Sequence, residues 1–502
     1  MKVYIDGHDC HYEVESLVRM FFPGKRLQVL QGAPENPEED AVYTRMACEG
    51  RRALLSVAVR LDGHSKTAEE AVDAARANLD AECERVFAVM LYRILAPLTG
   101  IHPGWGVLTG IRPVKFVHRY HAQGMEDSEI RRILSGQYLV TPQKIDLMLE
   151  TARQEAKVLA RSQPNSYSLY LSIPFCPTRC HYCSFVSHSI EKTHKLLPEY
   201  VELLIREIED AAERIHSVGG LRLETIYFGG GTPTTLSAEQ LRRVMDAVNR
   251  CFGSPCQGEY TVEAGRPDTI TEEKLRVLRA CGATRISINP QTMNDRVLEE
   301  IGRRHTVRQT VEAYELARRV GHDNINMDLI AGLPTDTPES FASSLDQVIG
   351  LGPENITLHT LSVKRAAALA EDAEQVHRAQ SRAVHAMLDY ASGRFAAEGY
   401  LPYYLYRQKN TVDNMENVGY CRRGHEGLYN VYIMDETHSI VALGAGGVTK
   451  LREPGGGLIQ RVFNYKYPYE YISRFDEVLR RKKQIPAFYA SHPFREGIQQ
   501  NL

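Results

Sequence analysis

The chain has no long run of apolar residues. The nearest candidate, between Val86 and Ile111, is interrupted by Arg93, Pro97 and His102, whereas a helix that spans a bilayer needs about 18 to 20 consecutive apolar residues. The opening residues, MKVYIDGHDCHYEVES, also lack the apolar core of an export signal. We therefore expect no membrane span and a cytoplasmic protein, in which the cysteines stay reduced and available for metal.

An excess of charge of either sign is absent too. Lysine and arginine together number 60 against 63 aspartates and glutamates, so the net charge is −3. A charge so close to balance gives no overall attraction to nucleic acid, and we expect no such partner. Repeats and low-complexity segments are missing, and the 43% hydrophobic and 25% charged content is typical of a globular protein. The length of 502 residues predicts about three domains.

Cysteine is sparse, and most of the ten cysteines are expected to be buried small hydrophobes. Cys251 and Cys256 form a close pair, but no second pair has matching spacing. Cys176, Cys180 and Cys183 lie together in YLSIPFCPTRCHYCSF, one cysteine short of a closed four-cysteine site. Three thiolates on one loop can bind a 4Fe–4S cluster and leave one iron open for a small molecule. An open coordination position distinguishes a working metal site from a structural one.

A structural zinc site is the alternative for this loop. Zinc would need a fourth ligand, and His181 and His188 are available nearby. The cysteines directly follow an apolar, strand-like run, SLYLSIPF, and Tyr182 and Phe185 flank the last of them. We favour the iron–sulfur cluster on this basis, and zinc remains open.

The middle of the chain alternates strand-like and helical segments. The strand-like runs are short and rich in β-branched residues, as strands buried on both faces should be. Repeated βα units with right-handed crossovers give a parallel sheet. Six units are too few for an eight-stranded barrel, so the predicted fold class is α/β with a partial (β/α)6 barrel. The six runs are SLYLSIP, LETIYFGGG, EYTVEAG, RISINPQ, NINMDLIAG and NITLHTL.

We expect three domains along the chain. Residues 1–160 should form an accessory α+β domain, because two strand-like segments precede a helix-rich stretch in which Thr141 and Pro142 are typical of a helix start. Residues 161–393 should form the barrel. The alternation then stops, and residues 394–502 should form a small α+β domain that covers the substrate.

Polar residues stand where the predicted strands end, and parallel α/β folds bind ligands at that edge. The second strand ends in the glycine-rich turn 229–233, where the backbone can approach a ligand and free amides or carbonyls can bind it; a plain tight turn is the alternative. Later strands deliver Glu263, Gln291 and Asp328, and Arg303 follows one helix after Gln291. Each of these four alone could be a solvated loop end or part of an internal salt bridge.

Together, these residues suit one ligand. An iron with an open site takes an amine and a carboxylate, and an α-amino acid offers both. Glu263 could pair with the ammonium group and Arg303 with the carboxylate. Gln291 and Asp328 could bind ribose hydroxyls, as acidic residues do in dinucleotide sites. A ligand that carries both an amino acid and a ribose indicates S-adenosylmethionine (SAM).

The pattern C-x3-C-x2-C, with an aromatic residue before its last cysteine and followed by a strand ending in GGTP, resembles the radical SAM superfamily. The resemblance implies reductive cleavage of SAM at the cluster, which gives methionine and a 5′-deoxyadenosyl radical that takes hydrogen from a substrate. The cofactors then carry the difficult chemistry, while the protein orients the reactants and excludes water.

A closer resemblance is to the oxygen-independent coproporphyrinogen III oxidases, on LYLSIPFC, GGGTPT, QTMN, IGRRH and INMDLIAGLP, which occur here in that order. The segments GWGVLTGIRPVK, NVGY, EGLYN and ALGAGG resemble its long coproporphyrinogen dehydrogenase branch, the HemZ type. The resemblance places the family's SAM contacts at Tyr170, Gly230, Thr232, Glu263, Gln291, Arg303 and Asp328. We add their neighbours Tyr182, Phe185 and Gly231 as cofactor-binding candidates.

The activity that this resemblance implies is the conversion of coproporphyrinogen III to protoporphyrinogen IX without oxygen, a step of haem biosynthesis. Two propionate side chains would be oxidatively decarboxylated to vinyl groups, with a tetrapyrrole as substrate and a flavodoxin or ferredoxin as electron donor. The four carboxylates of the substrate need cationic partners. The candidates are Arg112, Lys115, Lys364, Arg365 and Arg407.

Two departures from the oxidase pattern keep other functions open. The family's further cysteine is replaced by Phe185, and its E-x-N-P reads EAGRP from Glu263 to Pro267. The phenylalanine is shared with a sister branch of haem-trafficking proteins, whose H-N-x2-Y-W motif is absent because the only tryptophan is Trp105. We favour the enzyme over a radical SAM enzyme for another tetrapyrrole and over a haem-delivery protein. The haem-ligand candidates of a delivery protein are His305, His359, His425 and His438.

Overall fold

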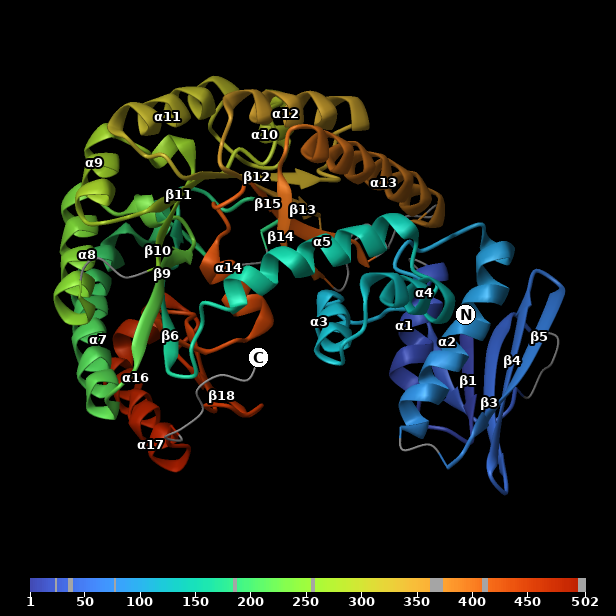
Figure 1. Ribbon diagram of the computed structural model, residues 1–502. Helices are drawn as coiled ribbons and strands as arrows, with labels where there is room; N and C mark the ends of the chain where they lie inside the picture. The colour runs from blue at the N-terminus through green and yellow to red at the C-terminus, as the bar shows by residue number, and fades with distance from the viewer. Residues whose placement is uncertain are drawn as a thin grey trace. The chain divides into compact units, whose positions relative to one another are not determined.

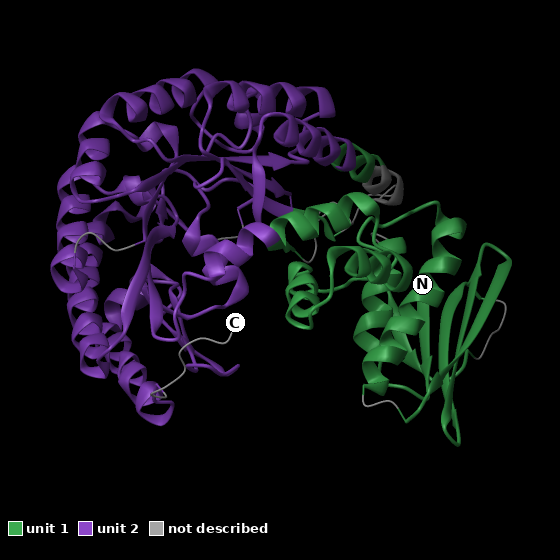
Figure 2. Ribbon diagram, viewed as in Figure 1, with its two compact units in different colours: residues 1–152, 362–384, 405–416 green, residues 153–361, 385–404, 417–502 purple. Residues whose placement is uncertain are grey.

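The computed structural model describes residues 1–22, 25–34, 39–75, 78–183, 187–253, 258–361, 373–408 and 414–494. The chain divides into two compact units (Figure 2). Unit 1 comprises residues 1–152, 362–384 and 405–416, and unit 2 comprises residues 153–361, 385–404 and 417–502.

Unit 1 is built on a five-stranded sheet with the order β2-β1-β3-β4-β5. Alternate residues of β4 are buried, which gives the sheet one face toward the core formed with α1 and α2. Strands β1 and β4 correspond to the two strand-like segments that were expected before the helix-rich stretch. The sequence did not indicate β5, because its residues are polar and nearly all exposed and only its pairing with β4 defines it. The strands are β1 (Lys2–Asp6), β2 (Gln28–Gln31), β3 (Ala41–Glu49), β4 (Arg52–Leu61) and β5 (His64–Asp73).

Among the described residues of this region, one helix lies between β1 and β2, and four more follow the sheet along the chain. The last of them begins at Pro142 directly after Thr141, as the sequence predicted. Proline suits this position because the first helical amide has no partner within the helix. The helices are α1 (His11–Phe21), α2 (Leu79–Thr99), α3 (Val114–Ala122), α4 (Asp127–Gln137) and α5 (Pro142–Leu159).

Unit 2 contains the predicted partial barrel. Its sheet has the order β14-β15-β13-β12-β11-β10-β9-β6-β16-β17-β18, and the strands from β13 to β6 are all parallel. These six parallel strands are the six runs expected from the sequence, so the (β/α)6 prediction is confirmed. They are β6 (Ser166–Ile173), β9 (Arg222–Gly230), β10 (Glu259–Gly265), β11 (Arg285–Ile288), β12 (Ile325–Ala331) and β13 (Asn355–Thr360).

Helices connect the parallel strands and cover their outer side (Figure 1). Several begin at side-chain caps: Ser237 and Thr306 each form a capping box with a glutamine three residues on. Such caps satisfy amides that have no partner inside the helix, so the helix starts are fixed locally. The helices are α7 (Leu197–Val218), α8 (Ala238–Phe252), α9 (Glu272–Ala280), α10 (Asp295–Glu300), α11 (Val307–Val320) and α12 (Pro338–Leu351).

The C-terminal part of the chain extends the same sheet at both edges. β14 (Leu401–Arg407) and β15 (Glu416–Cys421) lie beyond β13, while β16 (Ser439–Leu443), β17 (Val448–Arg452) and β18 (Ile459–Phe463) lie beyond β6. The division at residues 160 and 393 into three domains therefore stays a proposal. The remaining helices are α6 (Ile190–Thr193), α13 (Ala373–Ala397), α14 (Leu428–Asp435), α15 (Pro468–Ser473), α16 (Phe475–Lys482) and α17 (Gln484–Ser491).

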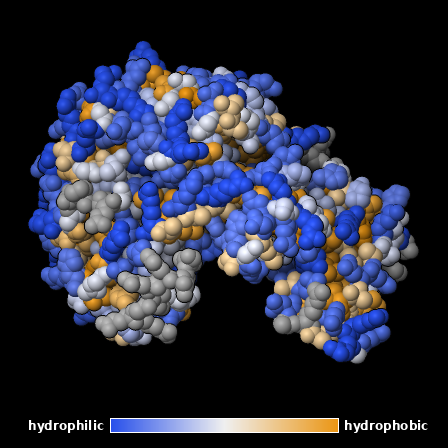
Figure 3. Space-filling model, in the orientation of Figure 1, coloured by the Kyte–Doolittle hydropathy of each residue, from blue (hydrophilic) through white to orange (hydrophobic). Residues whose placement is uncertain are grey.

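None of the described helices combines the length and apolar character that crossing a bilayer requires. Hydrophilic residues make up most of the surface visible in Figure 3.

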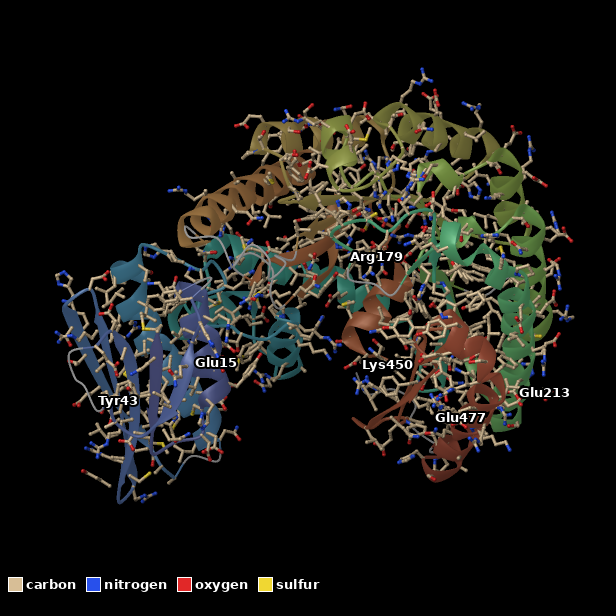
Figure 4. All side chains as sticks on the ribbon, turned by 180° about the vertical axis from the view of Figure 1, so that it is seen from behind. Glu15, Tyr43, Arg179, Glu213, Lys450 and Glu477 are labelled. Carbon is tan, nitrogen blue, oxygen red and sulfur yellow. The ribbon has the colours of Figure 1, made fainter. Side chains whose placement is uncertain are left out.

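A buried ion pair joins the first barrel helix to the C-terminal part of unit 2. Glu207 on α7 and Lys482 at the end of α16 are fully buried, with Oε1 3.2 Å from Nζ. Tyr471 Oη and the amide of Gly444 each donate to Glu207 Oε2 at 2.7 Å, and Asn464 Nδ2 donates to Oε1 at 2.7 Å. Figure 4 labels Glu213 and Glu477 on the same two helices. A buried charge with this many partners is strongly destabilising to disrupt.

We expect Glu207→Gln to lower the free energy of unfolding by about 3–5 kcal/mol, because it leaves the ammonium group of Lys482 buried without its counter-charge. Glu272→Gln is the matched control. It breaks the exposed pair with Arg276 and should cost less than about 1 kcal/mol. Urea unfolding followed by circular dichroism measures both. Equal effects of the two variants would contradict the assignment, and the double variant Glu207→Gln, Lys482→Met should cost less than the sum of its single changes.

Candidate cofactor site at the carboxyl ends of the barrel strands

The three cysteines of the motif occupy one loop after the first barrel strand. β6 leads through Pro174 into β7 (Phe175–Cys176), which pairs with β8 (His188–Ser189) across the loop. Cys180 and Cys183 lie between them, where the amide of Cys183 donates to the carbonyl of Cys180 at 3.2 Å. None of the three forms a disulfide bond, and burial raises the pKa of the Cys176 thiol. Arg179, in the middle of the loop, is labelled in Figure 4.

The three thiols share this loop without converging on one point. Among the described residues, no three side chains of His, Cys, Asp or Glu gather at metal-binding distances. Hydrogen-bond donors nevertheless reach two of the sulfurs. Thr232 Oγ1 donates to Cys176 Sγ at 3.5 Å, and Arg266 Nη1 donates to Cys180 Sγ at 4.0 Å. Donors aimed at sulfur are what a thiolate ligand needs when it is taken out of water.

The glycine-rich turn after β9 supports the cysteine strand. The amide of Gly231 donates to the Ile173 carbonyl at 2.8 Å, and the amide of Thr232 donates to the Phe175 carbonyl at 2.7 Å. A Cβ atom at Gly231 would lie 2.5 Å from that Phe175 oxygen, so only glycine fits. Neighbouring Gly230 has φ +101°, which also favours glycine. The expectation that free amides of this turn bind a ligand is therefore wrong for Gly231 and Thr232, whose amides hold the cysteine strand.

Two carboxylates from different strands lie inside the barrel. Glu263 on β10 accepts a hydrogen bond from Tyr227 Oη at 2.6 Å. Burial raises the pKa of Glu263 to about 7, the Tyr227 hydrogen bond opposes this shift, and the charge of Asp328 adds to it. Asp328 on β12 accepts from Asn326 Nδ2 at 2.7 Å, and His359 Nε2 lies 3.9 Å away. Although burial alone would raise the pKa of Asp328, these partners hold it below its usual value.

Gln291 and Arg303 come from the segment after β11. Gln291 has φ +72°, and its backbone exchanges hydrogen bonds with β12: its amide donates to the Asp328 carbonyl at 2.9 Å. Arg303 is buried, and its guanidinium donates to the Asn289 carbonyl at 2.6 Å and to Tyr182 Oη at 3.2 Å. Its Nε has no hydrogen-bond partner among the described residues. Arg303 therefore lies against the cysteine loop with a donor to spare.

A stack of tyrosine rings adjoins the carboxylates. The rings of Tyr227 and Tyr429 stack at 4.4 Å, and Tyr170 lies 6.2 Å from each. Tyr170 and Tyr227 are register partners on β6 and β9, whereas Tyr429 comes from α14, which packs against β9. Tyr170 was predicted from the sequence, but Tyr227 and Tyr429 were not. Tyr429 lies in the segment EGLYN, which resembles the HemZ-type branch. That resemblance was the sequence feature that could have indicated Tyr429.

A cavity of about 630 Å³ lies between the cysteine loop and the connection from α10 to α11. Thr178, Arg179 and His181 line it from the cysteine loop, and the segments 295–299 and 302–306 contribute the other lining residues. Arg303 is among them, so the cavity adjoins the predicted carboxylate-binding group.

The structure describes three of the five predicted substrate cations, and all three belong to unit 1. Arg407 is buried in unit 1, where Nε donates to the Asn414 carbonyl at 2.9 Å and the guanidinium lies 5.2 Å from the Trp105 ring. Its prediction as a substrate contact is therefore not supported. Arg112 and Lys115 belong to unit 1, just before and within α3. Lys364, Arg365 and the cofactor candidate Phe185 lie outside the described residues.

The histidines named for zinc or haem mostly have other roles. His181 faces away toward the helix connection, with Nδ1 3.0 Å from the Glu300 carbonyl. His438 is held on both ring nitrogens, by Ser162 and Ser168 at 2.8 Å each, and burial lowers its pKa to about 3. His359 pairs with Asp328, whose carboxylate lies 3.9 Å from Nε2. His305 is buried with no hydrogen-bond partner for either nitrogen among the described residues.

These residues fit an iron–sulfur cluster with bound SAM. The loop supplies three thiol ligands, and the second strand supplies a donor to one sulfur. Glu263 accepts a hydrogen bond from the neutral Tyr227 hydroxyl, and burial raises its pKa, so an ammonium group beside it would be favourable. Arg303 has an unused Nε, which suits a carboxylate.

Comparison with known proteins agrees with this site. A family model described as the Radical SAM superfamily matches residues 170–348. The oxygen-independent coproporphyrinogen-III oxidase-like protein HemZ of Bacillus subtilis is 37% identical over 97% of this chain and 98% of its own length. The heme chaperone HemW of the same organism is 38% identical over 39% of this chain and 51% of its own length. Coproporphyrinogen III oxidase (HemN) from Escherichia coli, a solved structure, has a TM-score of 0.49 and 24% identity over 65% of this chain and 73% of its own.

The full-length match decides the family, because it includes unit 1 and the C-terminal strands as well as the barrel. The superfamily assigns the cofactors, a 4Fe–4S cluster and SAM. The chain therefore belongs to the radical SAM superfamily and, within it, to the family of HemZ-like relatives of the oxygen-independent coproporphyrinogen III oxidases.

Proposed function

We propose that this protein converts coproporphyrinogen III to protoporphyrinogen IX without oxygen. Two propionate side chains each lose a β-hydrogen atom and CO2 and become vinyl groups, and one electron from each passes to an external one-electron acceptor. The observation that supports the proposal is a set of polar groups suited to SAM: Glu263 on β10, Asp328 on β12, and Arg303, which follows α10 and donates a hydrogen bond to Tyr182 of the cysteine loop.

In this proposal, bound SAM and its cluster supply the radical that takes the hydrogen atom. The residues of the chain bind and orient. Glu263 pairs with the ammonium group, Arg303 binds the carboxylate, and Gln291 and Asp328 hold the ribose hydroxyls. The stacked rings of Tyr170, Tyr227 and Tyr429 exclude water from the barrel interior beside these groups. Arg112, Lys115, Lys364 and Arg365 remain proposed partners of the substrate carboxylates.

Haem delivery is the second candidate function, because several relatives are heme chaperones. Two observations favour the enzyme. The chaperones match over part of their length, whereas the oxidase-like relative matches over nearly all of it. Of the four histidines considered as haem ligands, His438 and His359 already have side-chain partners, whereas His305 lines the cavity and is 2% exposed. A radical SAM enzyme for another tetrapyrrole is the third candidate.

Anaerobic incubation with coproporphyrinogen III, SAM and a reductant tests the substrate. We expect protoporphyrinogen IX to form together with 5′-deoxyadenosine and methionine. Release of deoxyadenosine without that product would overturn the substrate and leave the family unaffected. A haem titration of the same preparation distinguishes the second candidate, for which stoichiometric binding with a Soret band and no turnover is the expected result. A panel of other porphyrins tests the third.

We expect Cys176→Ala, Cys180→Ala and Cys183→Ala each to abolish SAM cleavage and lower the iron content, because each removes an anionic ligand of one iron. Cys251→Ala is the matched control, a partly exposed cysteine on the last turn of α8. It should retain iron and activity. Iron and sulfide analysis, an EPR spectrum of the reduced protein and a deoxyadenosine assay measure the outcome. Full iron content and activity in Cys180→Ala would contradict the cluster assignment.

The affinity for SAM should rise with pH between about 6 and 7.5. Glu263 has a pKa of about 7 in the ligand-free protein because it is buried. An ammonium group favours the ionised carboxylate, so each pH unit below this pKa should weaken binding by up to about tenfold. Anaerobic titration calorimetry measures the dissociation constant. Glu263→Gln should bind more weakly at pH 7.5 and lose the slope, and a slope that survives in this variant would refute the assignment of Glu263.

A further inference from the structure

Arg266 is a buried arginine directly beside the cysteine loop. It is 3% exposed. Its Nη1 donates to Thr178 Oγ1 at 3.0 Å and makes a long hydrogen bond of 4.0 Å to Cys180 Sγ. Both acceptors belong to the loop that carries the three cysteines, so one guanidinium group contacts the loop at two points.

The local backbone fixes Arg266 at this place. The pairing of β10 with β11 shifts register between Glu263 and Gly265, which marks a β-bulge, and Gly265 has φ +61°. A bulge adds one residue to a strand and redirects the side chains that follow. Thr234 Oγ1 donates to the Ala264 carbonyl at 2.6 Å, and Thr269 Oγ1 donates to the Arg266 carbonyl at 2.8 Å. The bulge thus turns the chain so that Arg266, two residues beyond Ala264, reaches the cysteines.

A carboxylate orients the guanidinium group. Asp268 accepts from Nε at 2.9 Å and from Nη2 at 2.7 Å, a bidentate pair that leaves Nη1 for the loop. Although burial alone would raise the pKa of Asp268, the guanidinium of Arg266 holds it below its usual value, so the pair is ionised. His305 adjoins this pair and Arg303; burial lowers its pKa to about 3, so its ring is neutral and adds no charge.

We propose that the Arg266 guanidinium sets the reduction potential of the cluster through its hydrogen bond and charge at the Cys180 sulfur. Hydrogen bonds to the ligand sulfurs, net charge and solvent exposure are the protein's means of tuning such a cluster. A positive charge beside a thiolate ligand favours the reduced, more negative cluster. Arg266 therefore makes the uptake of one electron easier. The inference rests on the cofactor that the family assigns and is independent of the tetrapyrrole on which the protein acts.

The test is an EPR-monitored redox titration of the reconstituted full-length protein, without SAM or porphyrin and with dithionite as the one-electron reductant. Arg266→Gln removes the charge but keeps an amide donor, and Arg266→Met removes both. We expect the midpoint potential to fall in both variants, and furthest in Arg266→Met. A tenfold change in the reduction equilibrium, about 59 mV for one electron, is the scale expected.

Asp268→Asn should shift the midpoint potential in the opposite direction, which a purely structural role of Arg266 would not produce. It keeps one oxygen as an acceptor for the guanidinium and removes the negative charge that offsets Arg266, so the midpoint potential should rise. Arg318→Met is the matched control. Arg318 makes a bidentate pair with Glu354, at 2.8 and 2.9 Å, at the other end of the barrel strands, and its loss should leave the potential unchanged.

The result that overturns the proposal is an unchanged potential in an Arg266 variant that retains full iron content. A shift of the same size in Arg318→Met would also overturn it. If neither Arg266 variant retains iron, Asp268→Asn decides, since an unchanged or lower potential there contradicts a role for the neighbouring positive charge.

Discussion

Glu263, Asp328, Arg266 and Arg303 are ionisable groups that are largely withdrawn from water, where a charge is costly unless it has a partner or a ligand. Asp268 satisfies Arg266, and His359 lies beside Asp328. Glu263 accepts a hydrogen bond from the Tyr227 hydroxyl, and its raised pKa shows that a nearby cation would stabilise its ionised form. The same constraint leaves Arg303 with an unused donor toward the cysteine loop. The site is thus a set of charges that its own residues neutralise only in part.

Much of this arrangement follows from local sequence. Each of the six parallel strands was visible as a short apolar run, and the structure has Glu263 and Asp328 within two of these strands and Gln291 shortly after a third. Their closeness then follows from parallel register, because the carboxyl ends of parallel strands meet at one edge. The helix starts at Ala238 and Val307 were similarly determined by capping boxes, and the start at Pro142 by a proline at the first helical position.

What the sequence could not show depends on distant pairing or on the use of backbone groups. Strand β5 is polar and is defined only by its partner β4. The amides of Gly231 and Thr232 looked available for a ligand, yet they hold the cysteine strand, a use that no pattern within GGGTP reveals. Arg407 could not be told from an exposed cation in the sequence. Its burial against Trp105 depends on two distant segments, since its hydrogen bond to Leu108 joins residues 299 positions apart.

The segment EAGRP, from Glu263 to Pro267, combines a feature that the sequence shows with a role that only the structure reveals. In the sequence, this segment lacks the asparagine that precedes the proline in the family pattern E-x-N-P. In the structure the segment contains a bulge, and the bulge delivers a buried guanidinium to a cysteine sulfur. The backbone conformation at Gly265 and the register shift beside it therefore place a positive charge next to one of the three cysteines.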